Sequence, residues 1–301
     1  MASLLKRIKI VTVAVPDVDE VAAIYRKWIG YKVVERGKVS ADLAALWASP
    51  AMKGRPYVTM QPASGVDVFV RAVEIDRVGN YRPMTSWGWG AIEIICRDPR
   101  PLSRKLAQSD FIVVGRPRFL NGYPTICAMQ VQGPGGEILY LTADTGPKSK
   151  SILPDPGAEV GRPFVMVVAS GSSERAVKWY AKHFKMKKAA VKGATIDIIQ
   201  NAQGLPPTHP FPMGFVPMSE AAHFVEFDGY PAGTGPRQRN HGQLPPGVAV
   251  AGFEITDLRA TKLKFLSKPA NLEGIGYDGR RVACTVGPGG ELIELIELAN
   301  K

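Results

Sequence analysis

The sequence contains few cysteines and few histidines, three and four respectively in 301 residues. Cys96, Cys127 and Cys284 are far apart and lie inside apolar, strand-like runs. This spacing excludes a disulfide framework and is not that of a zinc site. We interpret the three residues as buried structural thiols.

Long apolar runs are also absent. No stretch approaches the ~18 consecutive apolar residues that a membrane helix needs. The first residues show no apolar segment followed by a small-residue cleavage site. We therefore expect a cytoplasmic protein with no membrane partner. The apolar content of 45% is sufficient for two ordinary domains with hydrophobic cores.

The net charge of +11 raises the question of nucleic-acid binding. The densest basic run, residues 178–192, carries six lysines, but Tyr180 and Phe184 within it have the spacing of a helix buried on one face. We expect a solvated helix face there, with attraction of an anionic small molecule as the alternative. No nucleic-acid-binding signature accompanies the charge, so we expect no nucleic-acid partner.

Two segments of the chain are near copies of each other. Residues 133–143 read GPGGEILYLTA and residues 287–297 read GPGGELIELIE. Each lies between two apolar, strand-like runs, and its glycines suit a turn with positive φ angles. Both copies are therefore predicted to be β-hairpins.

A second repeat lies upstream of these turns. An alternating strand is followed by Asp17 as the expected helix N-cap, and Ser172 takes the same place in the second half. Weaker versions have Asp98 and Asp257 at the turn. The chain is thus predicted to contain four units, each a strand, a helix and three further strands.

Residues 146–162 are rich in Gly, Pro, Ser and Lys, which is typical of a linker between domains. We expect an N-terminal domain over residues 1–145 and a C-terminal domain over residues 163–301, each containing two consecutive units. Two irregular segments, residues 201–220 and 228–247, are predicted to be long loops that act as lids.

This pattern resembles the vicinal oxygen chelate superfamily, which includes glyoxalases, bleomycin-resistance proteins and extradiol dioxygenases. The resemblance covers nearly the whole chain. It implies an α+β fold of four βαβββ modules paired into two tandem cup-shaped domains, most like the two-domain extradiol dioxygenases. It also implies that the C-terminal domain holds the active site. The cup expected in the N-terminal domain has little to polarise a substrate, so we expect that domain to be structural or to form a homodimer.

The resemblance implies metal ligands on the first and last strands of the modules. The family's last-strand glutamate corresponds to Glu294, and Glu226 takes the same place in the third unit. Tyr140 and Phe69 stand there in the other two units. The first-strand positions, where the family usually has histidine, are all apolar: Ile10, Ala91, Val165 and Val250. We therefore expect no cofactor, with Glu226 and Glu294 as the ligands if a divalent metal binds.

Glu226 and Glu294 are the leading catalytic candidates. Because side chains alternate along a strand, Phe224 should share the cup face with Glu226 and contact substrate. Two buried carboxylates facing one cavity cannot both ionise at low cost, so the pair could serve as acid and base. Neutralisation by lysine or arginine is the structural alternative.

Further candidates lie on the long loops and on the first strand of the fourth unit. His209 and His241 could close over the cup as catalytic groups or replacement ligands, or be ordinary loop histidines. Arg237 and Arg239 could bind an anionic substrate group. Glu254 also falls on a cup-facing position, where a salt bridge is the alternative to substrate binding.

The sequence therefore favours a small-molecule enzyme, a lyase or isomerase that moves a proton in an apolar, aromatic and anionic compound. One alternative is a metal-dependent extradiol-type dioxygenase or lyase with rearranged ligands. The other is a noncatalytic protein that binds a small molecule.

Overall fold

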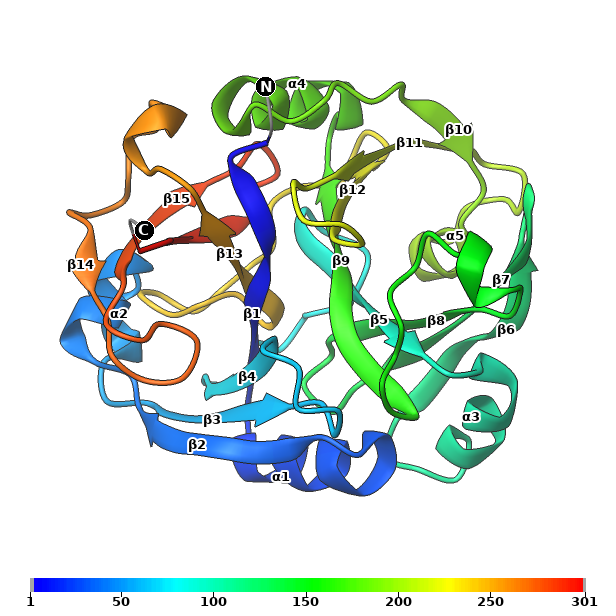
Figure 1. The fold of residues 1–301 in the computed structure, drawn as a ribbon, viewed down its shortest axis with the longest axis horizontal. Helices are drawn as coiled ribbons and strands as arrows, with labels where there is room; N and C mark the ends of the chain where they lie inside the picture. Colours follow the sequence, from blue (N-terminus) through cyan, green and yellow to red (C-terminus); the bar gives the residue numbers. More distant parts are fainter. Residues whose placement is uncertain (1–2, 300–301) are drawn as a thin grey trace.

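The computed structural model describes residues 3–299, which form two curled eight-stranded sheets flanked by short helices (Figure 1). Four consecutive modules each supply four strands. The predicted α+β class and the four modules in two cups are confirmed. Within these residues, no helix has the length and apolar character that a membrane crossing requires.

The first and second modules occupy the first half of the chain. The first contains β1 (Leu5–Val15), α1 (Val18–Ile24), the π-helix η1 (Tyr25–Ile29), β2 (Lys32–Lys38), α2 (Ala41–Leu46), the 3-10 turn η2 (Pro50–Met52), β3 (Pro56–Gln61) and β4 (Phe69–Glu74). The second contains β5 (Gly88–Cys96), α3 (Pro99–Leu106), β6 (Ile112–Leu120), β7 (Tyr123–Gln132) and β8 (Ile138–Asp144).

The third and fourth modules follow the 3-10 turn η3 (Lys148–Lys150). The third contains β9 (Val160–Ser170), α4 (Ser173–Phe184), β10 (Lys192–Ala194), α5 (Asp197–Gln203), β11 (Phe211–Pro217) and β12 (Phe224–Gly229). The fourth contains β13 (Gly247–Ile255), the 3-10 turn η4 (Arg259–Thr261), β14 (Ala270–Asn271), β15 (Arg281–Val286) and β16 (Leu292–Glu297).

The predicted caps form at the start of each module. Asp17, Asp98 and Ser172 each accept hydrogen bonds from backbone N–H groups in the first turn of the following helix. Asp257 caps residues Arg259 and Ala260 in the same way, but the chain there makes only the 3-10 turn η4. The helix expected in the fourth module is therefore absent from the described part of the chain.

The modules pair differently from the expected arrangement. One sheet has the order β14-β15-β16-β13-β1-β4-β3-β2, and the other β10-β11-β12-β9-β5-β8-β7-β6. The first module therefore shares a sheet with the fourth, and the second with the third, rather than each with its neighbour in sequence. Residues 146–162, expected to link two domains, join β8 to β9 inside one sheet.

The first strands of the modules explain why this pairing is hidden in the sequence. β1 pairs antiparallel with β13, and β5 with β9, at the middle of the two sheets. All four strands are almost entirely buried. Because each is apolar on both faces, its sequence does not specify which of the other three it joins.

Each sheet encloses a separate apolar core on its concave side. We call the concave side of the sheet formed by modules one and four the one–four cup, and that of modules two and three the two–three cup. Ile10, Phe69 and Val250 belong to the core of the one–four cup. Ala91 and Val167 belong to that of the two–three cup. A third core lies between the helices and the sheets and joins residues of all four modules.

Each GPGG turn joins two strands of one sheet, and the glutamate after it contacts a module of the other sheet. Gly136 and Gly290 both have φ of 79°, so the duplicated hairpin prediction holds. The glutamate after each turn is buried and accepts a hydrogen bond from a tyrosine hydroxyl of a helix. The O–O distances are 2.9 Å from Tyr25 to Glu137 and 3.0 Å from Tyr180 to Glu291. These bonds join module one to module two and module three to module four, so each crosses between the two sheets.

The first of the two expected lid loops contains regular secondary structure. Residues 201–220 contain the end of α5 and the whole of β11. Residues 230–246 form the other irregular segment, which lies against the first module through a hydrogen bond from Ala51 N–H to the Gly242 carbonyl at 2.9 Å. Helix α5 was missed because its seven residues have no side-chain N-cap.

Candidate functional site

The one–four cup contains a buried polar cluster around Glu294. Its carboxylate accepts hydrogen bonds from Trp47 Nε1 at 3.0 Å and from the Tyr277 hydroxyl at 2.9 Å. The Arg71 guanidinium lies 3.9 Å from it and also donates to Thr12 Oγ1 at 2.8 Å. Glu294 and Arg71 are 0% and 2% exposed. The structure therefore places Glu294 in a closed ion pair and not in an open cavity.

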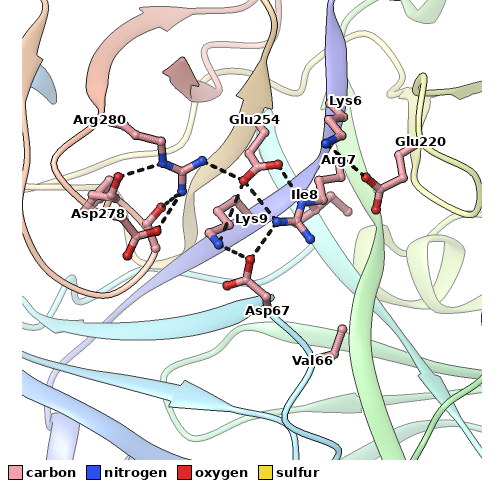
Figure 2. Close-up of polar contacts among 12 residues, drawn as sticks. Lys6, Arg7, Ile8, Lys9, Val66, Asp67, Glu220, Glu254, Asp278 and Arg280 are labelled. Atoms are coloured by element: carbon pink, nitrogen blue, oxygen red, sulfur yellow. Dashed lines mark hydrogen bonds and ion pairs between the residues drawn. The ribbon is translucent and has the colours of Figure 1, made fainter. Parts of the chain in front are cut away.

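A second ion-pair network lies on the same sheet (Figure 2). Glu254 accepts hydrogen bonds from Arg7 at 2.7 Å and from Arg280 at 2.8 Å. Asp67 lies 2.7 Å from the Arg7 guanidinium and 2.5 Å from Lys9 Nζ. Burial alone would raise the pKa of Glu254, but the hydrogen bonds from Arg7 and Arg280 lower it to about 2. Glu254 is therefore ionised and engaged by arginine.

The two–three cup contains three carboxyl groups. Glu226 and Asp228 lie two residues apart on β12, so both side chains point to the same face of the strand. Glu93 on β5 stands beside Tyr140 in the sheet register, and it accepts a hydrogen bond from the Thr142 hydroxyl. In the part of the chain that the structure describes, no lysine or arginine compensates any of the three.

Asp228 is the most unusual of these groups. It is 0% exposed, and neither carboxylate oxygen has a hydrogen-bond partner among residues 3–299. Burial raises its pKa, and burial together with the charges of Asp228 and Glu93 raises the pKa of Glu226 well above its ordinary value. Glu226 keeps some contact with solvent. A raised pKa keeps such a group protonated at a pH where an ordinary carboxyl is ionised, which is what a general acid needs.

The walls of the two–three cup are aromatic and apolar. Burial raises the pKa of Tyr140 and Tyr230 well above the ordinary value, so both phenols remain neutral donors. Phe211 lies 6.2 Å from the Tyr230 ring, measured between centroids. Ile198 and Ile199 of α5 belong to the same core. Helix α5 therefore covers the cup that holds the uncompensated carboxyl groups.

The two leading candidates do not face each other. Glu226 lies on β12 in one sheet, whereas Glu294 lies on β16 in the other. We expected them to face each other across one cup because we expected the third and fourth modules to share a sheet. The sheet order shows that they do not. For the same reason they cannot ligate one metal ion together.

The histidine candidates are also separated. The His209 ring packs on Phe211, 5.1 Å between centroids, and so lies beside the two–three cup. His241 is exposed in the 230–246 segment, next to Gly242, which bonds to the first module. Of the two histidines, only His209 lies beside the two–three cup, through its contact with Phe211.

Of the remaining candidates, Arg237 and Arg239 lie on the 230–246 segment, and Phe224 lies on β12 two residues before Glu226. The Arg237 guanidinium donates to the carbonyls of Trp89 at 2.7 Å and Val248 at 2.9 Å, so it holds two strands together. Arg239 is exposed. Phe224 stacks on Phe215 with ring centroids 4.6 Å apart.

Comparisons with known proteins match this architecture. No family model and no curated protein matches the sequence. Among solved structures, glyoxalase I from Zea mays covers 97% of this chain and 92% of its own, with a TM-score of 0.63 and 17% identity. A candidate dioxygenase from Bacillus subtilis covers 98% of this chain and 86% of its own, with a TM-score of 0.64 and 11% identity. The chain has the vicinal oxygen chelate fold. At these identities the similarity shows the fold and not the reaction.

The register shows what stands at corresponding positions in the two cups of this vicinal oxygen chelate fold. Thr12, five residues before the cap Asp17, pairs with Arg71, and Val167, five before Ser172, pairs with Glu226. Arg71 is therefore the counterpart of Glu226, and not Phe69 as expected. In the one–four cup, Arg71 lies beside Glu294 and balances its charge. In the two–three cup, the position that corresponds to Arg71 holds Glu226 instead.

The metal site implied by the vicinal oxygen chelate fold does not fit either cup. In the one–four cup the Arg71 guanidinium occupies the place beside Glu294 where a cation would bind. Nowhere in residues 3–299 are three or more His, Cys, Asp or Glu side chains grouped to hold a metal ion. The first-strand positions are apolar in every module, so they add no ligand.

Two functional candidates were missed from the sequence. Asp228 follows Glu226 by two residues in FVEFD, so the alternation that selected Glu226 also selects Asp228. Arg71 is a charged residue inside the apolar strand FVRAVE, which signals a buried partner. Both signals were present in the sequence, but the partners of Arg71 are distant along the chain and Asp228 has no partner among the described residues.

Proposed function

We propose that the chain is a small-molecule enzyme that moves a proton within an apolar, aromatic substrate bound in the two–three cup. The supporting observation is the buried Asp228 carboxylate, which has no hydrogen-bond partner in the described chain and lies beside Glu226. A buried polar group without a partner is rare in proteins and is a place where a ligand atom can bind. The reaction class is isomerisation or β-elimination.

Asp228 and Glu226 take different roles in this mechanism. The deprotonated Asp228 accepts the proton of a substrate C–H bond, and the electron pair of that bond moves into the new double bond. Glu226, whose pKa is raised by burial and by Asp228 and Glu93, donates its proton to the substrate oxygen or leaving group. Because Glu226 retains contact with solvent, it can exchange protons with water between turnovers.

The cup favours a substrate that is neutral at its reacting end. Tyr140, Tyr230 and Phe211 offer aromatic surface, and the tyrosine hydroxyls offer hydrogen bonds to a carbonyl or hydroxyl group. The three carboxyl groups repel an anion, because no cation compensates them within the described residues. The anionic group expected from the net charge would therefore not lie beside Asp228.

Deuterium incorporation from D₂O, followed by proton NMR, tests this proposal without knowledge of the product. The panel consists of neutral aromatic carbon acids, such as aryl ketones and their β-hydroxy derivatives. The native protein should exchange a C–H proton of at least one compound, and Asp228→Asn should lower that rate by roughly 10²- to 10⁴-fold. Exchange that continues unchanged in Asp228→Asn would remove this residue from the mechanism.

A further inference from the structure

A cleft of about 270 Å³ lies where the two sheets meet, next to the core of the one–four cup. Its walls come from the end of α2, the start of β5, the 230–246 segment and the fourth module. We call it the junction cleft, and its main lining residues are Trp47, Trp87, Arg237, Arg239, Leu266 and Val286. The volume suits a ligand of one or two rings, below the size of most drug-like molecules.

The walls of the junction cleft include unusually exposed apolar side chains. Leu266 and Val286 are 37% and 41% exposed, although both are large hydrophobic residues. Trp87 is partly buried, and its indole N–H donates to the Thr234 hydroxyl at 2.8 Å, which fixes the ring. Trp47 is fully buried beneath the cleft, where its indole N–H donates to Glu294. A flat apolar group could cover these side chains with little loss of their mobility.

The cleft is also positively charged. Arg237 is fixed by neutral acceptors, the Pro246, Val248 and Trp89 carbonyls, so no carboxylate cancels its charge within residues 3–299. Arg239, two residues along the same segment, is exposed. A guanidinium group in this position can pair with a carboxylate through two parallel hydrogen bonds.

One carboxyl group also borders the cleft. Glu291 accepts hydrogen bonds from the Tyr180 hydroxyl at 3.0 Å and from the Gly289 N–H at 2.7 Å. Its carboxyl is directed to these donors, and Glu291 is only 1% exposed. Glu291 therefore does not pair with Arg237 or Arg239, and their positive charge remains available to a ligand in the cleft.

We propose that the junction cleft binds an aromatic carboxylate. The Trp87 ring and the exposed side chains of Leu266 and Val286 contact the aromatic body. Arg239 pairs with the carboxylate, supported by the fixed charge of Arg237. The net charge of +11 draws anions toward the protein. This site is distinct from the two–three cup, whose carboxyl groups repel such a ligand, and it does not depend on the proposed proton transfer.

Equilibrium dialysis against 2-naphthoate tests this proposal, with 2-naphthalenemethanol as the neutral comparator. We expect one saturable site for the acid and weaker binding of the alcohol. Arg239→Gln should weaken the binding of naphthoate about tenfold, as expected for loss of a charge-assisted pair. Arg259→Gln is the matched control, because Arg259 is also exposed and lies away from the cleft.

Two further variants locate the bound naphthoate. Trp87→Leu should reduce its binding, whereas Asp228→Asn should leave it unchanged. Thermal melts verify that every variant is folded. The proposal is overturned if naphthoate does not saturate a site at millimolar concentration, or if Arg239→Gln binds it as the native protein does. It is also overturned if Asp228→Asn abolishes binding, which would place the acid in the two–three cup while leaving the proton-transfer proposal open to its own test.

Discussion

At the scale of single residues, the two cups differ in whether a buried acid has a partner. Glu294 is enclosed by Arg71, Trp47 and Tyr277, which satisfy its charge and both oxygens. Asp228 has no such partners in the described chain. Compensation of this kind stabilises a fold, whereas an uncompensated buried acid is a reactive group.

Replacement of Glu294 tests its structural role. Glu294→Gln leaves the buried Arg71 charge uncompensated, so we expect the free energy of unfolding to fall by about 3 kcal/mol. Urea denaturation measures the change. Glu273→Gln, at an exposed position of the same module, is the control and should unfold like the native protein. A Glu294→Gln variant as stable as the native protein would contradict the ion-pair assignment.

The sequence predicted which way the acidic side chains point, but not which residues contact them. Alternation along the strands correctly placed Glu226 and Glu294 on cup-facing positions. The counterpart in the first module was expected at Phe69, two residues before Arg71, because that module has no GPGG turn to mark the start of its last strand. A register error of two residues keeps the face and changes the residue.

At the scale of elements, the GPGG turns are also contact points between the sheets. The sequence placed Tyr180 where the first half has Tyr25 and showed a glutamate after each turn. It did not show that these residues meet, since the bonds Tyr25–Glu137 and Tyr180–Glu291 span 112 and 111 residues. The helix and turn patterns are local, whereas their contact depends on the packing of whole modules.

Removal of one hydroxyl tests this connection. Tyr25→Phe removes the hydroxyl donor of Glu137, and Tyr180→Phe removes that of Glu291, so each should lower the free energy of unfolding by about 1–3 kcal/mol. The two effects should add in the double variant, because the sites share no partner. Tyr123→Phe, at a 55% exposed position, serves as the control. Urea midpoints unchanged in both single variants would show that the bonds do not stabilise the fold.

At the scale of the whole molecule, module sequences predicted four units but not their pairing. Each unit carries its own strand, turn and apolar pattern, so the units were visible. The apolar first strands β1, β5, β9 and β13 are interchangeable by pattern, and the Gly- and Pro-rich segment 146–162 suggested a boundary that the sheets do not follow. The pairing of modules decides which side chains share a cup. The candidate site therefore changed from Glu226 with Glu294 to Glu226 with Asp228.

The buried carboxyl groups together predict how stability depends on pH. Burial raises the pKa of Glu93, Glu137 and Glu291 from 4.5 to about 7. Between these values the folded protein holds protons that the unfolded chain has released, so the free energy of unfolding falls as pH rises. His223 acts oppositely: burial and Arg162 lower its pKa to about 3, so its contribution is lost on acidification below 6.5. The three carboxyl groups together change the free energy of unfolding more than the one histidine does, so the net effect is a loss of stability as pH rises.

Urea denaturation at about pH 5.5 and about pH 8 measures this dependence. We expect the free energy of unfolding to be lower at the higher pH by about 1 kcal/mol or more, since one unit of pKa shift corresponds to about 1.4 kcal/mol. Glu137→Gln, which no longer titrates, should show a smaller difference. Stability that rises over this interval would contradict the raised pKa values.

The central claim is that the two–three cup, and not the one–four cup, carries the chemistry. The most direct test compares Asp228→Asn with Glu294→Gln in the deuterium-incorporation assay, with each rate divided by the folded fraction from a urea curve. The account predicts a loss of roughly 10²- to 10⁴-fold in Asp228→Asn and an unchanged rate per folded molecule in Glu294→Gln. An unchanged rate in Asp228→Asn together with a loss in Glu294→Gln would contradict it and place the reaction in the one–four cup.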